Sequence, residues 1–388
     1  MSKNYNQSLS QTNTLSVVYF LLFSLYLANL FIIPPVTAQQ QRMAVVINGL
    51  NKFETLSVVN LDHPDLKKAV SADIAQLGVA PNDVQITGNL AYIVNTFSHH
   101  VQVINLKTGD SLGVISTGIG SEPEKIALLN NDRAYVTCGG TDEVVLIDLK
   151  GKIVLQRIQT GSKPWGLTIL NKKVYVANSA AIWTGQEMKY GQSSVSVIST
   201  DTNQLITTIE VPTNATEVTS DANNTVLVVS TGDYSQVLGE LILIDSNKDN
   251  IKKQISLKST PGAITVNRKK QQAYILTPSG AIVVDLIKQR LVVKPSSALQ
   301  DFKGGFSLTF DNQRELFLLA VPDWSGGSQD QLLVLDSNGK EINRYNTGTK
   351  KGKGSSFVSL ADISGYNDVG VQPRPNQSVI FWGRVKQH

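Results

Sequence analysis

The sequence AYVTCGGTDEVVLIDL occupies residues 134–149 and decides the fold of this chain. Two runs of alternating apolar and polar residues, rich in β-branched side chains, lie on either side of Gly139 and Gly140. Alternation of this kind is typical of half-buried strands, and paired glycines permit a tight reversal, so the stretch predicts a β-hairpin. The same pattern recurs upstream at residues 91–106 and downstream at residues 174–200.

Three independent marks of this repeat can be followed along the chain, and each occurs seven times. The first mark is a strand that ends in an apolar pair and a small polar residue, at Asn60, Asn105, Asp148, Ser199, Asp245, Asp285 and Asp336. The second is the strand before it, which ends at Asn48, Asn95, Cys138, Asn178, Ser230, Thr277 and Ala320. The third is a proline in the loop that leads into the first strand, three positions before an apolar residue, at Pro81, Pro123, Pro164 and Pro261. In the other three repeats Ala215, Gly305 and Phe357 replace the proline.

The first mark recurs every 40 to 51 residues. A period of this length with four strands per repeat predicts an all-β, seven-bladed β-propeller with four-stranded antiparallel blades. One such sheet cannot bury both of its faces alone, whereas sheets packed around a ring can. A β-solenoid would need shorter repeats of parallel strands, and a sandwich would not keep one period over seven repeats.

The phase of the repeat predicts how the ring closes. Residues 43–48 and 55–61 match the second and third strands of the repeat, but no first strand precedes them. Residues 355–363, near the other end of the chain, match a first strand that has no second or third strand after it. We therefore expect one blade to combine N- and C-terminal strands, within a propeller that covers residues 39–363. Residues 62–80 would then carry an outer strand or a short helix, and residues 364–388 have no place in the repeat.

Several strand and loop sequences resemble the YVTN family of β-propeller repeat proteins. The residues that carry the resemblance are Tyr92-Ile-Val-Asn95, Tyr135-Val-Thr-Cys138, Tyr175-Val-Ala-Asn178, Thr160-Gly161 and Pro164. The resemblance extends over roughly residues 43–363, although LVVS at 227–230 and FLLA at 317–320 lack the Tyr and Asn. It implies a surface-layer, adhesion or other extracytoplasmic interaction protein, and some proteins with this fold are enzymes. It implies no catalytic residues.

The N-terminal segment predicts export from the cytoplasm. Residues 17–33 form a continuous apolar run of seventeen residues, followed by two prolines and then by Val36 and Ala38. Small residues at these two positions suit a signal peptidase site, so we expect residues 1–38 to be a signal peptide that is cleaved after Ala38. The alternative is an uncleaved membrane anchor, for which the run is short. Either segment places the propeller in the periplasm or outside the cell.

Composition narrows the function classes. The formal net charge is +4, and the basic residues are scattered along the sequence, which argues against nucleic-acid binding. The single cysteine, Cys138, cannot form an internal disulfide and is expected to be inert, because no histidine adjoins it. The chain has only four histidines, and the neighbours His99 and His100 cannot easily bind one ion together, so we expect no metal and no cofactor. We expect a monomer.

The loops that lead into each blade and the loops between its second and third strands should share one face of the ring. Three of the latter are expanded, at residues 179–194, 230–240 and 321–331. Expanded loops with exposed aromatic residues are where propellers usually bind partners. We therefore predict a binding site for a protein, glycan or small ligand on this face, formed by Trp165, Trp183, Tyr190, Tyr234, Asp323, Trp324, Lys350 and Lys351.

Three alternatives stay open. The aromatic residues could simply pack their loops against the blades, and the lysines could belong to a solvated loop. The protein could be a hydrolase or lyase, such as a lactonase, that uses carboxylates at the central channel; the candidates are Glu122, Glu217 and Asp301. It could also be a purely structural surface-layer component.

Overall fold

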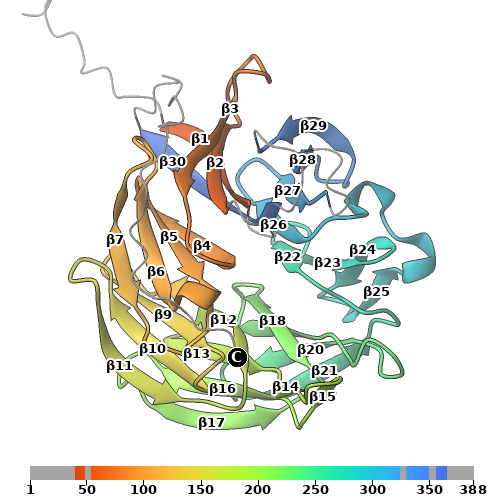
Figure 1. Cartoon of the computed structure of the whole chain (residues 1–388). Helices are drawn as coiled ribbons and strands as arrows, with labels where there is room; N and C mark the ends of the chain where they lie inside the picture. Colours follow the sequence, from red (N-terminus) through yellow and green to blue (C-terminus); the bar gives the residue numbers. More distant parts are fainter. Residues whose placement is uncertain (1–39, 49–53, 324–328, 349–354, 365–388) are drawn as a thin grey trace, which may run out of the picture. The chain divides into compact units, whose positions relative to one another are not determined.

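The protein is described by a computed structural model that covers residues 40–48, 54–323, 329–348 and 355–364. The chain divides into two units, Met1–Gln40 and Gln41–His388, and the second holds a ring of seven four-stranded antiparallel blades (Figure 1). This confirms the predicted fold. No helix in the described ranges is long and apolar enough to cross a membrane. The predicted signal segment and Trp324, Lys350 and Lys351 lie outside these ranges.

Each blade begins with its inner strand. Blade 1 contains β4 (Pro81–Thr87), β5 (Leu90–Asn95), β6 (His100–Asn105) and β7 (Ser111–Ser116). Blade 2 contains β8 (Pro123–Leu128), β9 (Arg133–Cys138), β10 (Glu143–Asp148) and β11 (Ile153–Gln159). Blade 3 contains β12 (Pro164–Leu170), β13 (Lys173–Asn178), β16 (Ser194–Ser199) and β17 (Leu205–Glu210). Blade 4 contains β18 (Ala215–Ser220), β19 (Thr225–Ser230), β20 (Glu240–Asp245) and β21 (Asn250–Ser256).

The remaining blades follow the same order. Blade 5 contains β22 (Ile264–Asn267), β23 (Gln272–Thr277), β24 (Gly280–Asp285) and β25 (Arg290–Val293). Blade 6 contains β26 (Ser307–Asp311), β27 (Leu316–Val321), β28 (Gln331–Leu335) and β29 (Glu341–Asn346). Blade 7 contains β30 (Ser355–Ser364), β1 (Gln40–Asn48), β2 (Thr55–Asn60) and β3 (Val70–Gln76). The loops carry a hairpin, β14 (Ala181–Trp183) and β15 (Met188–Tyr190), and the 3-10 helices η1 (Thr96–Ser98), η2 (Pro295–Ser297) and η3 (Gln300–Phe302).

Blade 7 closes the ring with strands from both ends of the repeat region, as the phase of the repeat predicts. Its strand order is β3-β2-β1-β30, so the last strand of the described chain pairs with the first. Residues 62–80 contain the outer strand β3, so this segment forms an outer strand and not a short helix, the other structure that the sequence allowed. Residues 365–388, for which the sequence predicts no position, lie outside the described ranges.

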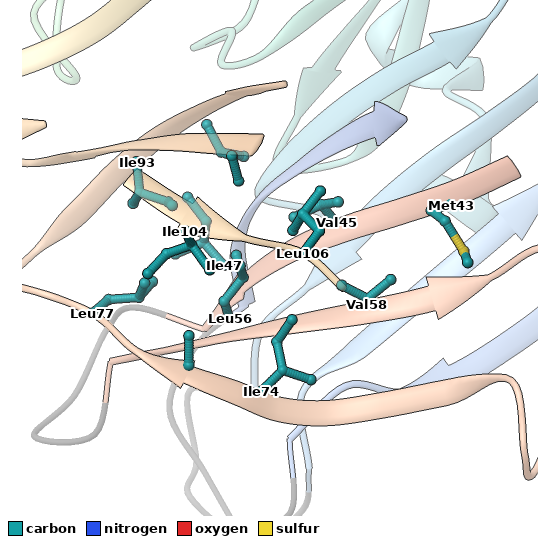
Figure 2. Packing of buried hydrophobic residues seen from close by; sticks show 13 residues of the cluster. Met43, Val45, Ile47, Leu56, Val58, Ile74, Leu77, Ile93, Ile104 and Leu106 are labelled. Carbon is teal, nitrogen blue, oxygen red and sulfur yellow. The ribbon is translucent and has the colours of Figure 1, made fainter. Parts of the chain in front are cut away.

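The hydrophobic core lies between neighbouring blades. One cluster joins Met43, Val45 and Leu56 of blade 7 to Ile93 and Ile104 of blade 1 (Figure 2). The sequence predicted half-buried strands for the hairpin at residues 134–149, but this hairpin is more than half buried. All four central residues of β10, from Val144 to Ile147, are buried. Alternation suggested one solvated face, but a neighbouring blade covers each face of the sheet.

The repeated aspartates at the ends of the third strands stabilise turns. Asp148 Oδ1 accepts hydrogen bonds from the backbone N–H groups of Lys150 at 2.9 Å and Gly151 at 2.7 Å. Asp245, Asp285 and Asp336 accept equivalent bonds two residues ahead. Side-chain caps of this kind hold tight turns, so these carboxylates serve the fold.

Candidate functional site

Hydrogen bonds show that two sets of loops share one face of the ring, as predicted. In several blades the loop after the second strand donates a backbone hydrogen bond to the loop that enters the same blade. The donor and acceptor pairs are Thr96 and Ala80 at 3.0 Å, Gly139 and Glu122 at 3.0 Å, Ser179 and Lys163 at 3.0 Å, and Thr231 and Asn214 at 2.8 Å. We call this surface the loop face.

The seven inner strands line a central cavity of about 710 Å³. Its lining comes from the first residues of the inner strands and from the loop-face residues Thr231, Tyr234 and Thr277, so the cavity belongs to the loop-face half of the ring. The charged residues in the lining are Asp83, Lys125 and Glu217. The aromatic residues in the lining are Trp165, Tyr234, Phe306 and Phe357.

Asp83 is held in place by the backbone at the junction of blades 1 and 2. Its Oδ1 accepts a hydrogen bond from Val84 N at 2.9 Å, and its Oδ2 accepts one from Ile126 N at 2.9 Å. Burial raises the pKa of the Asp83 carboxyl above its ordinary value, and the positive charge of Lys125 partly opposes this shift. The Asp83 carboxyl is therefore less well solvated than a free side chain, which strengthens its interaction with nearby charges.

Lys125 is the cation of this cavity and is only 8% exposed. Its Nζ donates a hydrogen bond to the carbonyl oxygen of Asn82 at 3.2 Å and lies 3.8 Å from the centre of the Phe357 ring. A carbonyl oxygen and an aromatic face both stabilise an ammonium group. Lys125 is thus held in position without a carboxylate within ion-pair distance among the described residues.

Glu217 enters the cavity from blade 4. Burial raises its pKa, the charge of Lys125 lowers it, and the charge of Asp83 raises it. The three groups therefore influence one another across the cavity, although they come from three different blades. No described residue forms a side-chain hydrogen bond or ion pair with the Glu217 carboxylate, so that carboxylate is available to a ligand.

A second buried carboxyl group lies beside the cavity. Glu124 is 7% exposed and accepts a hydrogen bond from the side-chain amide of Asn82. Burial raises its pKa from 4.5 to about 7, and this effect outweighs the hydrogen bond and the charge of Lys125, which both lower it. Glu124 does not line the cavity, but it is linked to Lys125 through Asn82, whose side-chain amide donates a hydrogen bond to Glu124 and whose carbonyl oxygen accepts one from Lys125.

The predicted binding residues fall into three groups. Trp165 and Tyr234 line the cavity, and Tyr234 is 65% exposed. Trp183 lies on β14 and is 62% exposed, while Tyr190 lies on β15, where burial and then the neighbouring Tyr234 and Asp233 raise its pKa. Asp323 donates its backbone N–H to Asp330 at 2.8 Å and does not line the cavity.

The three carboxylates proposed for an enzyme are not gathered at one place. Glu217 lines the cavity, whereas Glu122 forms an ion pair with Lys163 at 3.6 Å. Asp301 belongs to η3 and accepts a hydrogen bond from Glu341 N at 3.0 Å, outside the cavity lining. Among the described residues, no group of three His, Cys, Asp or Glu side chains is placed to hold a metal ion.

Sequence reasoning missed Asp83 and Lys125, although a signal was present. Each lies two residues after the proline that marks the start of its inner strand, and Glu217 lies two residues after the equivalent Ala215. This position faces the cavity in all three blades. The phase of the repeat therefore marks this position of the inner strand as a candidate, although only the structure shows that the three charged groups share one cavity.

Comparison with known proteins supports the fold. No family model matches the sequence, and no curated protein matches it. A solved structure of Kuenenia stuttgartiensis hydrazine synthase matches with a TM-score of 0.59 at 15% identity, over 73% of this chain and 95% of that chain. A quinonprotein alcohol dehydrogenase-like protein from Bacteroides thetaiotaomicron matches with a TM-score of 0.57 at 12% identity, over 83% and 78%. At these identities the likeness concerns the fold alone.

Proposed function

We propose that this protein is an extracytoplasmic, YVTN-like propeller that binds a small polar ligand or a glycan end in its central cavity. The observation that carries the proposal is the cavity of about 710 Å³, which combines aromatic surfaces with the half-buried carboxylate of Glu217 beneath the loop face. Pockets that bind small molecules span roughly 300 to 1,000 Å³ and combine apolar walls with a few fixed polar groups. The location outside the cytoplasm rests on the predicted signal segment.

The side chains of the cavity indicate how such a ligand would be held. Trp165 offers an aromatic face for a sugar ring or a heterocycle, and Glu217 accepts hydrogen bonds from hydroxyl or amino groups. Lys125 is already positioned by Asn82 and Phe357, so its remaining N–H groups can donate to the ligand with little loss of side-chain entropy. A neutral or zwitterionic polar molecule satisfies all of these groups.

The hairpin β14–β15 supports recognition at the rim of the cavity. It exposes Ile182 at 53%, Trp183 at 62% and Met188 at 47%, and its Tyr190 lies close to Tyr234. Exposed apolar side chains on a loop that departs from a repeat are typical of binding surfaces. This hairpin would contact the part of a ligand that extends beyond the cavity.

A ligand screen by thermal shift, followed by calorimetry on cavity variants, tests the proposal. Glu217→Gln and Trp165→Ala should each weaken binding of a ligand found in the screen by about tenfold or more, since the first removes a charged hydrogen-bond acceptor and the second an aromatic surface. Glu210→Gln is the matched control, because Glu210 is exposed on the outer strand β17. Equal affinity in the wild type and both cavity variants would refute the cavity as the site.

A hydrolase or lyase is the second candidate, and one observation favours it. Asp83 and Glu217 both have raised pKa values and face the same cavity as Lys125. Carboxyl groups with raised pKa values that face a cavity are candidates for general acid–base catalysis. If the protein is such an enzyme, Glu217→Asn will abolish turnover of the identified ligand, whereas a pure binding protein will return that ligand chemically unchanged.

A further inference from the structure

Four cationic side chains from two neighbouring blades line one groove on the outer edge of the ring. Lys253 lies on β21 and Lys258 just after it, while Arg290 begins β25 and Lys294 follows it. The groove has a volume of about 250 Å³, and no acidic residue is among those that line it. The four residues are exposed. We call this feature the cationic groove.

The four cations differ from many others in the described part of the chain because none of them has an anionic partner there. Elsewhere Lys173 pairs with Asp249 at 2.7 Å, and Arg157 pairs with Glu143 at 2.9 Å. Like charges brought together on a surface repel one another unless an anion joins them. Their convergence therefore creates a positive potential that attracts negatively charged partners.

The spacing of the charges favours a linear anion with several charges over a single small one. A strand advances about 3.3 Å per residue, so Arg290 and Lys294 are roughly 13 Å apart along the chain. Lys253 and Lys258 lie closer together than an extended strand of five residues would place them, because β21 ends at Ser256 and Lys258 has a φ of 53°. The distance from Arg290 to Lys294 exceeds the reach of one sulfate or phosphate group, whereas a chain with repeated anionic groups can contact all four residues of the groove.

The remaining lining of the groove suits a polysaccharide. Gln254, Ser256 and Gln289 provide amide and hydroxyl groups that can hydrogen-bond sugar hydroxyls, and Leu291 contributes apolar surface. No aromatic side chain lines the groove, so the groove offers no platform on which nucleic-acid bases could stack. Arg290 adds a planar fork that fits sulfate or carboxylate oxygens.

We infer that the cationic groove binds an acidic polysaccharide, a glycan chain that carries sulfate or carboxylate groups. The groove lies on the outer strands, whereas the cavity is lined by the inner strands. The inference does not depend on the proposed function of the cavity, since the two features share no residue. Together they would let the protein hold a charged surface polymer while its cavity stays free for a second ligand.

Titration of fluorescently labelled heparin fragments into the protein at low salt tests this inference. The groove variant carries the four substitutions K253Q, K258Q, R290Q and K294Q. The matched control removes the same total charge at exposed lysines outside the groove, with K67Q, K107Q, K248Q and K303Q. We expect the groove variant to bind heparin at least tenfold more weakly, because several ion pairs are lost together, and the control to stay within about threefold of the wild type. Thermal unfolding of both variants checks that the fold is retained.

Three outcomes would overturn the inference. Equal losses of affinity in the groove variant and the control would show that heparin responds only to the net charge. Displacement of the fragment by millimolar inorganic sulfate would show a site for a single anion. Single-stranded DNA could also displace heparin at a concentration equal to that of heparin. If the groove variant no longer bound this DNA, the groove would bind nucleic acid rather than glycan.

Discussion

Glu124 gives the sharpest prediction about stability, because the fold raises its pKa from 4.5 to about 7. The folded protein therefore binds this proton more tightly than the unfolded chain does. The stabilisation from the protonated carboxyl is complete below pH 4.5 and is lost as the pH rises through about 7. A tenfold change in proton affinity is worth about 1.4 kcal/mol, so ionising Glu124 costs the folded state on the order of 3 kcal/mol.

The substitution Glu124→Gln isolates this effect. Glutamine is neutral at every pH, nearly the same size, and keeps an oxygen that can accept the hydrogen bond from Asn82. We expect the variant to match the wild type near pH 4.5 and to exceed its free energy of unfolding by about 2 to 3 kcal/mol at pH 8. Other titrating groups, such as Asp83 and Glu217, contribute to both proteins and cancel in the difference.

Urea unfolding followed by tryptophan fluorescence at several pH values from 4.5 to 8 measures the difference. Glu210→Gln, at an exposed position, is the control and should follow the wild type throughout. A difference between E124Q and the wild type that stays constant with pH would refute the argument. It would mean that Glu124 is ionised at neutral pH and is stabilised by water or by groups outside the described residues.

Three further predictions concern packing and reactivity. Phe317→Ala should destabilise the protein by about 3 to 5 kcal/mol in urea unfolding, because the ring is buried and lies 4.5 Å from both Tyr274 and Phe310, centre to centre. Gly166→Ala should lower the melting temperature clearly more than Gly262→Ala, since an added Cβ would lie 2.3 Å from a backbone oxygen of β18 at the first position and meets nothing within 4 Å at the second. Cys138 should not react with a thiol reagent in the native protein, because burial raises its pKa to about 12; rapid modification without denaturant would contradict this.

Part of the candidate site could be derived from the sequence. The repeat placed the expanded loops on one face, and the hydrogen bonds from Ser179 to Lys163 and from Thr231 to Asn214 agree with that. Glu217 was identified as a channel carboxylate and lines the cavity, but Glu122 and Asp301 do not. Their loops have the right phase, yet ion pairing with Lys163 and a hydrogen bond from Glu341 occupy them. A pattern reports which loop a residue occupies, but not the neighbour that its side chain contacts.

The sequence by itself determined the number of blades, the four strands in each, and closure by blade 7, because each blade's alternation and turn residues are local properties that a linear pattern records. Only the tertiary structure decided which charges meet. Asp83, Lys125 and Glu217 share one cavity because the ring brings the inner strands of different blades together. The basic residues appeared scattered, but the ring places Lys253 and Arg290 side by side in one groove. Contacts between blades depend on the geometry of the ring, which no single repeat encodes.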